Sequence, residues 1–255
     1  MNSFLRAAAI VAATIAGLIL SSCEREPGSG PNAEGINGGV KVYNVYGEEQ
    51  DPSGITVTME QTGKTTLTDH EGGYVFPYLE SGTYSFKFTK DGFPATYVRD
   101  VEHKRTKHFS TPAPVARVIE HSTYYVTEAS VTVNTETQGG PYFILKGKLN
   151  KPVPAGKEIR LKLYLDDEET VSLSNFVHFF PYRVTGQEFE LYYPYFASLT
   201  SNGEMKRGDR VYMVFFTDAM VEDNCTGEYL KPDCTNSTSI NTTNPIVLNE
   251  VIPQL

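Results

Sequence analysis

Tryptophan is absent from the sequence, cysteine occurs only three times, and long stretches of Ala, Leu, Glu and Lys are few. The shortage of such stretches, set against 16 Tyr, 14 Phe and 21 Gly, favours strands over helices. Lys and Arg number 22 against 31 Asp and Glu, a formal charge of −9, so the charge balance attracts neither nucleic acid nor an anionic membrane. We therefore expect an all-β protein that binds no nucleic acid.

The common catalytic and nucleotide-binding motifs are also missing. The chain contains no G-x-S-x-G, no H-E-x-x-H, no P-loop and no Gly-rich dinucleotide fingerprint. We expect a protein that is not an enzyme, with no catalytic residues, no metal site and no cofactor. A hydrolase with an unrecognised site is the least favoured alternative.

The N-terminus carries the clearest signal in the chain. Residues 7–20 form an almost wholly apolar run after Arg6, shorter than the roughly 20 residues that cross a bilayer and typical of a secretion signal. The sequence LSSC at 20–23 resembles the lipobox of bacterial lipoproteins. This resemblance implies that residues 1–22 are removed and that Cys23 is lipidated. The alternative is an ordinary signal that ends at an unrelated cysteine.

Residues 23–35 are rich in Gly, Pro, Ser and Asn and predict a flexible tether. Glu24 and Glu26 follow Cys23 closely and resemble the acidic signal that displays Bacteroidetes lipoproteins on the outer leaflet. The resemblance implies an outer-membrane protein that is lipid-anchored and exposed at the cell surface. Loss of Arg6 with the signal would change the charge from −9 to −10, so attraction to the membrane surface would not hold the chain there.

Residues 36–110 show short alternating segments separated by turns, the pattern of a small antiparallel sandwich. The motif T-x-T-D-x-x-G-x-Y-x-F at 66–76, followed by L-x-x-G-x-Y at 79–84 and K-x-G-F at 90–93, resembles the carboxypeptidase regulatory-like domain. That resemblance implies a non-catalytic, transthyretin-like β-sandwich. From the residues alone, we expect Asp69 to accept hydrogen bonds from backbone amides of the turn that it opens.

Residues 111–114, with the sequence TPAP, predict a stiff and extended linker. Residues 115–255 again alternate as strands, about seven over this length, which suits an immunoglobulin-like or fibronectin III-like sandwich. The predicted fold is therefore two consecutive antiparallel β-sandwiches, at 36–110 and 115–255, after the signal peptide and tether.

A long segment at 218–244 separates two well-patterned strands and is much longer than an ordinary hairpin loop. Its two cysteines predict a disulfide in an exported chain. Loops on a rigid scaffold are common binding sites, but a surface excursion stapled for stability is the favoured alternative. The residues of interest are the cysteines, three acids and one tyrosine: Cys225, Cys234, Glu222, Asp223, Glu228 and Tyr229.

Two further stretches have a functional and a structural interpretation. Residues 192–196, with the sequence YYPYF, contain rings of the kind that stack on sugars, although alternate rings of a strand are normally buried. Residues 166–169, with the sequence DDEE, resemble calcium ligands but lack EF-hand spacing, so a solvated turn is favoured.

These observations together predict a binding or scaffolding lipoprotein. The leading hypothesis is an accessory of a surface glycan or nutrient uptake system, with a glycan ligand or a TonB-dependent transporter system as partner. This partner is suggested by the family resemblance alone. A structural or adhesive cell-surface subunit is the main alternative.

Overall fold

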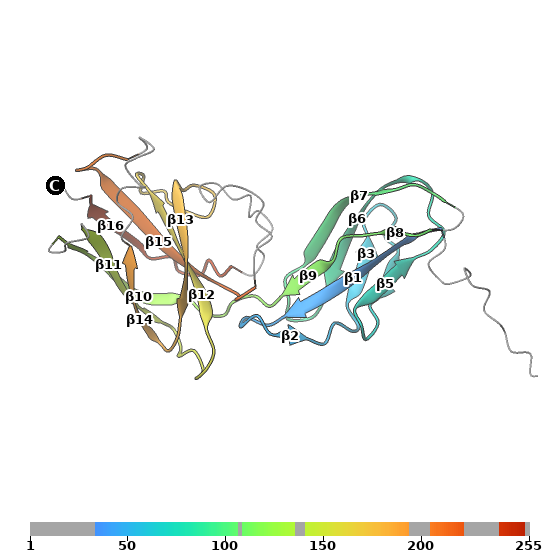
Figure 1. The fold of residues 1–255 in the computed structure, drawn as a ribbon, viewed down its shortest axis with the longest axis horizontal. Coiled ribbons are helices and arrows are strands. Elements are labelled where there is room, and N and C mark those ends of the chain that lie inside the picture. The colour runs from blue at the N-terminus through green and yellow to red at the C-terminus, as the bar shows by residue number, and fades with distance from the viewer. Residues whose placement is uncertain (1–33, 107–108, 136–140, 194–204, 222–239, 253–255) are drawn as a thin grey trace, which may run out of the picture.

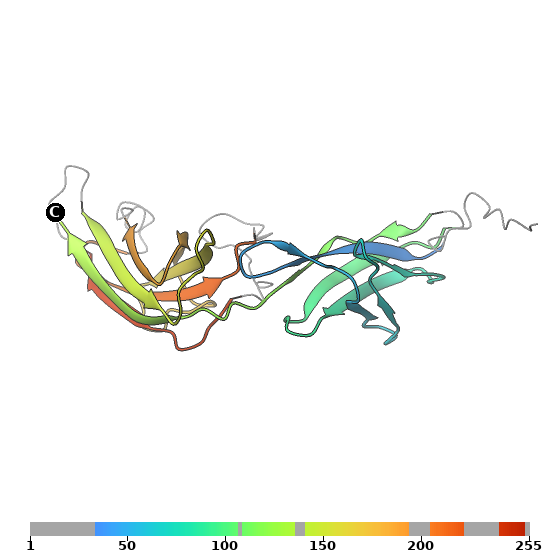
Figure 2. The same cartoon turned by 90° about the horizontal axis from the view of Figure 1, so that it is seen from below.

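The computed structural model describes residues 34–106, 109–135, 141–193, 205–221 and 240–252. Every regular secondary-structure element in these ranges is a β-strand, so the all-β prediction is confirmed. The strands form two β-sandwiches that follow one another along the chain and along the long axis of the molecule (Figures 1 and 2).

The first sandwich consists of nine strands in two sheets. One sheet has the order β2-β1-β5, with β8 and β9 also paired to β1, and the other has the order β4-β3-β6-β7. The bounds are β1 Ile36–Tyr43, β2 Glu49–Gln50, β3 Thr56–Met59, β4 Thr65–Leu67, β5 Gly73–Phe76, β6 Gly82–Thr89, β7 Thr96–His103, β8 Thr111–Pro112 and β9 Ala116–Ile119.

The core of the first sandwich follows from the alternation of its strands. Inward positions of β3, β5 and β6 are buried, and the ring centroids of Phe76 and Phe86 lie 5.4 Å apart between the sheets. At the turn before β5, Asp69 Oδ1 accepts hydrogen bonds from the amides of Glu71 (2.9 Å) and Gly73 (2.7 Å). The turn role predicted for Asp69 is thus confirmed.

The segment predicted as an interdomain linker belongs to the first sandwich. Thr111 and Pro112 form β8, which runs parallel to the start of β1, and β9 runs parallel to its second half. Ala113, Ala116 and Val118 are buried in the first core. The predicted linker at 111–114 and the boundary at 115 therefore differ from the structure, because a Pro-rich edge segment retains enough amides to pair with β1.

The second sandwich consists of seven strands. One sheet has the order β10-β11-β14 and the other β13-β12-β15-β16. The bounds are β10 Val126–Asn134, β11 Tyr142–Leu149, β12 Ile159–Asp166, β13 His178–Val184, β14 Glu188–Tyr193, β15 Arg210–Asp218 and β16 Val247–Val251.

Residues from both sheets of the second sandwich fill its main core, among them Phe143, Leu145, Leu163, Tyr193 and Phe215. A smaller apolar cluster lies on the other side of β12 and β15, where Tyr164, Val214 and Phe216 contact Val171 and Ile240. The β13-β12-β15-β16 sheet is therefore covered by apolar side chains on both faces in this region, which explains why β12 and β15 are almost continuously buried.

The tip of the β1–β2 hairpin connects the two sandwiches. Val45 is buried in the core of the second sandwich, and its carbonyl accepts a hydrogen bond of 2.9 Å from the amide of Met220. The hydroxyls of Tyr46 and Tyr124 lie 2.8 Å apart, and Lys157 of the second sandwich pairs with Glu48 of the hairpin. The two sandwiches therefore contact each other directly through this hairpin tip, in addition to being joined by the chain.

Candidate functional site

The outer face of the β10-β11-β14 sheet carries the candidate site, a solvent-facing hollow lined by residues of all three strands. Alternation along β11 and β14 sends Phe143, Leu145, Phe189, Leu191 and Tyr193 into the core. The residues between them face outward. Because paired residues of antiparallel strands share a face, the strand register collects the outward side chains into rows that cross the three strands.

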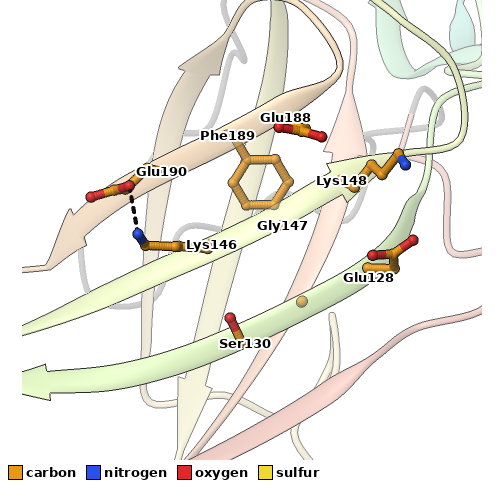
Figure 3. A pocket seen from close by; sticks show the side chains of 9 residues that line it. Glu128, Ser130, Lys146, Gly147, Lys148, Glu188, Phe189 and Glu190 are labelled. Atoms are coloured by element: carbon orange, nitrogen blue, oxygen red, sulfur yellow. Dashed lines mark ion pairs between the residues drawn. The ribbon is translucent and has the colours of Figure 1, made fainter.

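The rows contain mainly charged and hydroxyl-bearing side chains. Lys146 pairs with Glu190 on one side and Ser130 on the other, and Lys146 Nζ lies 2.9 Å from Glu190 Oε2 (Figure 3). In the next row, Lys148 lies between Glu128 and Glu188 in the register. Cations on the central strand thus alternate with carboxylates on its neighbours.

A hollow with a volume of about 630 Å³ lies among these rows. Gly147 is one of its lining residues, and a Cβ there would lie 2.3 Å from Phe189 Cζ and 2.8 Å from the carbonyl oxygen of Glu128. A glycine therefore lets the Phe189 ring pack directly beneath β11. The lining residues, most of them labelled in Figure 3, are Glu128, Ala129, Ser130, Lys146, Gly147, Lys148, Glu188, Phe189 and Glu190.

Two tyrosines continue this face beyond the hollow. The rings of Tyr142 and Tyr192 are 5.7 Å apart at an angle of 65°, and Tyr192 is 53 % exposed. Tyr192 Oη donates a hydrogen bond of 2.6 Å to Glu190 Oε1, and Asn134 Nδ2 donates one of 3.1 Å to Tyr142 Oη. Each ring is held at its hydroxyl while part of its surface remains open to solvent.

Glu190 links the tyrosine pair to the charged rows. Hydrogen bonds from Tyr192 and Lys146 hold the pKa of the Glu190 carboxyl below its usual range. The same carboxylate raises the pKa of the Tyr192 hydroxyl. Glu190 is therefore ionised and Tyr192 protonated at neutral pH, so this pair offers carboxylate oxygens that accept hydrogen bonds and a hydroxyl that donates one.

Two residues of the predicted aromatic stretch at 192–196 fall within the described ranges. Tyr192 points outward, whereas Tyr193 is fully buried and stacks on Phe143 with a centroid distance of 6.4 Å. Residues 194–196 lie outside the described ranges. Sequence reasoning missed Tyr142 and Glu190, because alternation places them on the wet side of a strand but does not show which strands are neighbours.

The other predicted site residues belong to segments outside the described ranges. These residues, all outside the part of the chain that the structure describes, are Cys23, Cys225, Cys234, Glu222, Asp223, Glu228 and Tyr229. The predicted lipidation, disulfide and binding loop therefore stay predictions.

The last described residues on either side of the 222–239 segment contact the second sandwich. Val221 is buried in the main core and Ile240 in the smaller cluster. Nearby, Lys162 Nζ lies 2.7 Å from Asp218 Oδ2, and both side chains are 1 % exposed. A buried ion pair thus lies close to the point where the predicted loop begins.

The described ranges contain no group of three or more His, Cys, Asp and Glu residues that could hold a metal ion. Asp166, from the predicted calcium-like run, is buried, and its Oδ1 accepts a hydrogen bond of 3.1 Å from the amide of Glu168. His103 is also buried and bonds Thr111 Oγ1 at 2.8 Å, which suits a structural role. No helix in the described ranges is long and apolar enough to span a membrane.

Comparisons with known proteins give weak similarities. No protein-family model and no curated protein matches the chain. A candidate carbohydrate-binding protein of Bacteroides uniformis, whose crystal structure is known, is 15 % identical with a TM-score of 0.29, over 86 % of this chain and 99 % of that one. A DUF3823 family protein of Parabacteroides merdae is 10 % identical with a TM-score of 0.31, over 86 % of this chain and 100 % of that one.

A pilin subunit of Bacillus cereus is also similar, at 11 % identity and a TM-score of 0.25, over 87 % of this chain and 69 % of that one. TM-scores this low carry no argument about function.

Proposed function

We propose that the chain is a non-enzymatic, lipid-anchored outer-membrane protein that serves as a binding or scaffolding accessory of a surface glycan or nutrient uptake system. The observation that carries this proposal is the outer face of the β10-β11-β14 sheet. There, a hollow of about 630 Å³ and two held tyrosine rings lie on a rigid sheet among hydrogen-bonding side chains. Such a convergence of ring surface and fixed polar groups is typical of a binding site.

The arrangement of the two sandwiches supports this function. Strand β1 starts at the end of the first sandwich that is remote from the second (Figure 1). A lipid on Cys23 and the tether at 23–35 would therefore place the first sandwich next to the membrane. The second sandwich, with its candidate face, would be held farther out.

The anchoring part of the proposal is tested by replacing Cys23. Because the tether has little apolar surface and the chain is acidic, the lipid would supply nearly all the membrane affinity. The Cys23→Ala variant should leave the membrane fraction, whereas a Cys225→Ala variant should stay in it. Retention of Cys23→Ala in a detergent-dependent fraction would contradict the lipoprotein assignment.

The uptake part is tested in cells that lack the protein. We expect slower growth on at least one polysaccharide as the sole carbon source, with normal growth on its monosaccharide. The intact protein should also be isolated together with a TonB-dependent transporter after mild cross-linking. Normal growth on every polysaccharide tested, together with no such transporter, would argue against the proposed function.

A structural or adhesive subunit is the second candidate. It is favoured by the hairpin tip that joins the sandwiches through Val45 and Tyr46, since such a joint suits a stiff spacer. In that case the cells that lack the protein should lose adhesion or surface assembly while growing normally on all polysaccharides.

A further inference from the structure

We propose that the outer face of the β10-β11-β14 sheet binds an uncharged polysaccharide chain, with Tyr142 and Tyr192 as its stacking surface. This inference rests on the proposed function, because it names the ligand class that an uptake accessory would capture. The new content is the ligand class, an uncharged polysaccharide, and the stacking role of the two tyrosines.

The tyrosine pair supplies the apolar part of the recognition. A pyranose ring presents C–H groups on one side, which pack well on an exposed aromatic ring. Tyr192 is 53 % exposed, and Tyr142 contacts it edge-on at 5.7 Å. Hydrogen bonds to Glu190 and from Asn134 fix both hydroxyls before any ligand arrives. Few additional side chains then lose rotational freedom on binding, so the cost in conformational entropy is low.

The side chains around the rings supply the polar part. Each hydroxyl of a sugar can both donate and accept, and the face offers both kinds of partner. Asn134 has an amide, Ser130 and Thr132 have hydroxyls, and Glu190 has carboxylate lone pairs beyond those used by Tyr192 and Lys146. Such a mixture of hydrogen-bond donors and acceptors can pair with the hydroxyls of a sugar chain.

The charge pattern argues that the ligand is uncharged. Lys146 is neutralised by Glu190 at 2.9 Å, and Lys148 lies between Glu128 and Glu188 in the register. Cations and carboxylates alternate across the three strands, so no field of a single sign extends over the face. With two lysines and three glutamates in these rows, a polyanion and a polycation would each meet repulsion as well as attraction there.

The length of the face argues for a chain of sugars and against a single one. Polar outward residues recur along β10 from Glu128 to Asn134, six residues apart, which corresponds to roughly 20 Å of extended strand. The hollow lies toward one end of this line and the tyrosine pair toward the other. Several linked sugars could therefore lie along the face and contact both features.

The test is affinity gel electrophoresis of the full chain, purified in detergent, in gels that contain one polysaccharide each. The probes are amylopectin, galactomannan, xyloglucan and inulin as neutral chains, with polygalacturonate and heparin as charged ones. We expect retardation by at least one neutral chain and by neither charged one. Tyr192→Ala and Tyr142→Ala should each weaken that retardation roughly tenfold, as expected for the loss of one stacking ring.

Two variants keep the result specific. Tyr192→Phe retains the ring and loses only the hydroxyl, so it should keep most of the affinity. Tyr78→Ala removes a more accessible ring, 76 % exposed on the first sandwich, and should leave retardation unchanged. Thermal unfolding of each variant shows whether a loss of affinity reflects a loss of fold.

Several outcomes would overturn the inference. They are retardation by charged chains alone, retardation that survives both alanine variants, or no retardation by any neutral chain while a protein partner protects this face in cross-linking. None of these touches the growth and transporter experiments. The gel experiment can therefore refute polysaccharide binding at this face without refuting the proposed function. Conversely, the growth and transporter experiments can refute the proposed function while the gel experiment still shows polysaccharide binding.

Discussion

At the residue scale, Gly147 shows how one missing side chain lets a core ring pack directly beneath the candidate face. Any Cβ at this position would meet the Phe189 ring and the backbone of β10. Since a well-packed core tolerates little added volume, Gly147→Ala should lower the free energy of unfolding by about 1–3 kcal/mol. Urea unfolding measures this change.

The matched control for Gly147 is Gly39 in β1, whose nearest non-neighbouring atom to an added Cβ is 3.9 Å away. Gly39→Ala should change the stability by much less. Equal effects of the two substitutions would show that the contact with Phe189 does not determine the packing at Gly147.

A second residue-scale prediction concerns Asp166. Burial raises the pKa of its carboxyl, although the backbone hydrogen bond from Glu168 opposes this. A raised pKa means that the folded state holds the proton more tightly than the unfolded state, so stability falls as the pH rises from the usual Asp value of 3.8 through the folded pKa. Asp166→Asn should flatten this decline in unfolding midpoints measured from pH 4 to 7.

Asp51 serves as the control with the opposite sign. Hydrogen bonds from the amide and hydroxyl of Ser53 lower the pKa of its carboxyl. Its contribution to stability is therefore present above pH 3.8 and is lost as the pH falls through the folded pKa. Asp51→Asn should leave the slope between pH 4 and 7 unchanged and flatten the loss of stability below pH 3.8, so its midpoints are also measured below that pH. A parallel response of the two variants would refute both assignments.

The sequence predicts single residues well where the cause is local. The turn role of Asp69 depends on amides within four residues of it and is confirmed. The opposite faces of Tyr192 and Tyr193 follow from strand alternation. The meeting of Tyr142 with Tyr192 was not predictable in the same way, because it depends on which strands pair and in which register.

At the element scale, the β1–β2 hairpin is both an edge of one sandwich and part of the core of the next. Gly47 at its tip has a φ of +78°, and an added Cβ would lie 2.7 Å from the carbonyl oxygen of Met220. The tip therefore needs glycine both for its backbone conformation and for the close approach of the second sandwich.

We predict that Tyr46→Ala at this tip destabilises the second sandwich more than the first. The substitution removes the contact between its hydroxyl and that of Tyr124, and the ring that packs on the second core. Scanning calorimetry should show a lowered transition, or two separated transitions where the parent chain has one. Tyr78→Ala, on an exposed ring of the first sandwich, is the control and should leave the transitions in place.

Sequence reasoning failed at the element scale where pairing is long-range. The stretch at 111–114 has the composition of a linker, yet Thr111 and Ala113 donate hydrogen bonds of 2.8 and 2.7 Å to the carbonyl oxygens of Gly35 and Asn37. Strands so short become ordered only because β1 is already in place, more than 70 residues earlier. The composition of this stretch reveals its prolines but does not reveal that β1 is available as a partner strand.

At the scale of the whole molecule, the two sandwiches should behave as one unit. A chain that begins at Val115 would keep β9 without its partner β1, and the second core would lose Val45. We expect such a chain to unfold at a clearly lower temperature than residues 34–255, as measured by circular dichroism. Equal melting temperatures would restore the boundary predicted from the sequence.

The parallel pairing of β1 with β9 also sets how the molecule would respond to mechanical load. A lipid anchor would pull on the start of β1, while a ligand on the second sandwich would pull on the end of β9 in the opposite direction (Figure 1). Two parallel strands pulled in this way are sheared, so their cross-strand hydrogen bonds share the force and do not open one at a time. The resistance of the β1–β9 pair to force then depends on its unfolding rate. The cell could therefore exert force on a bound polymer without unfolding the first sandwich.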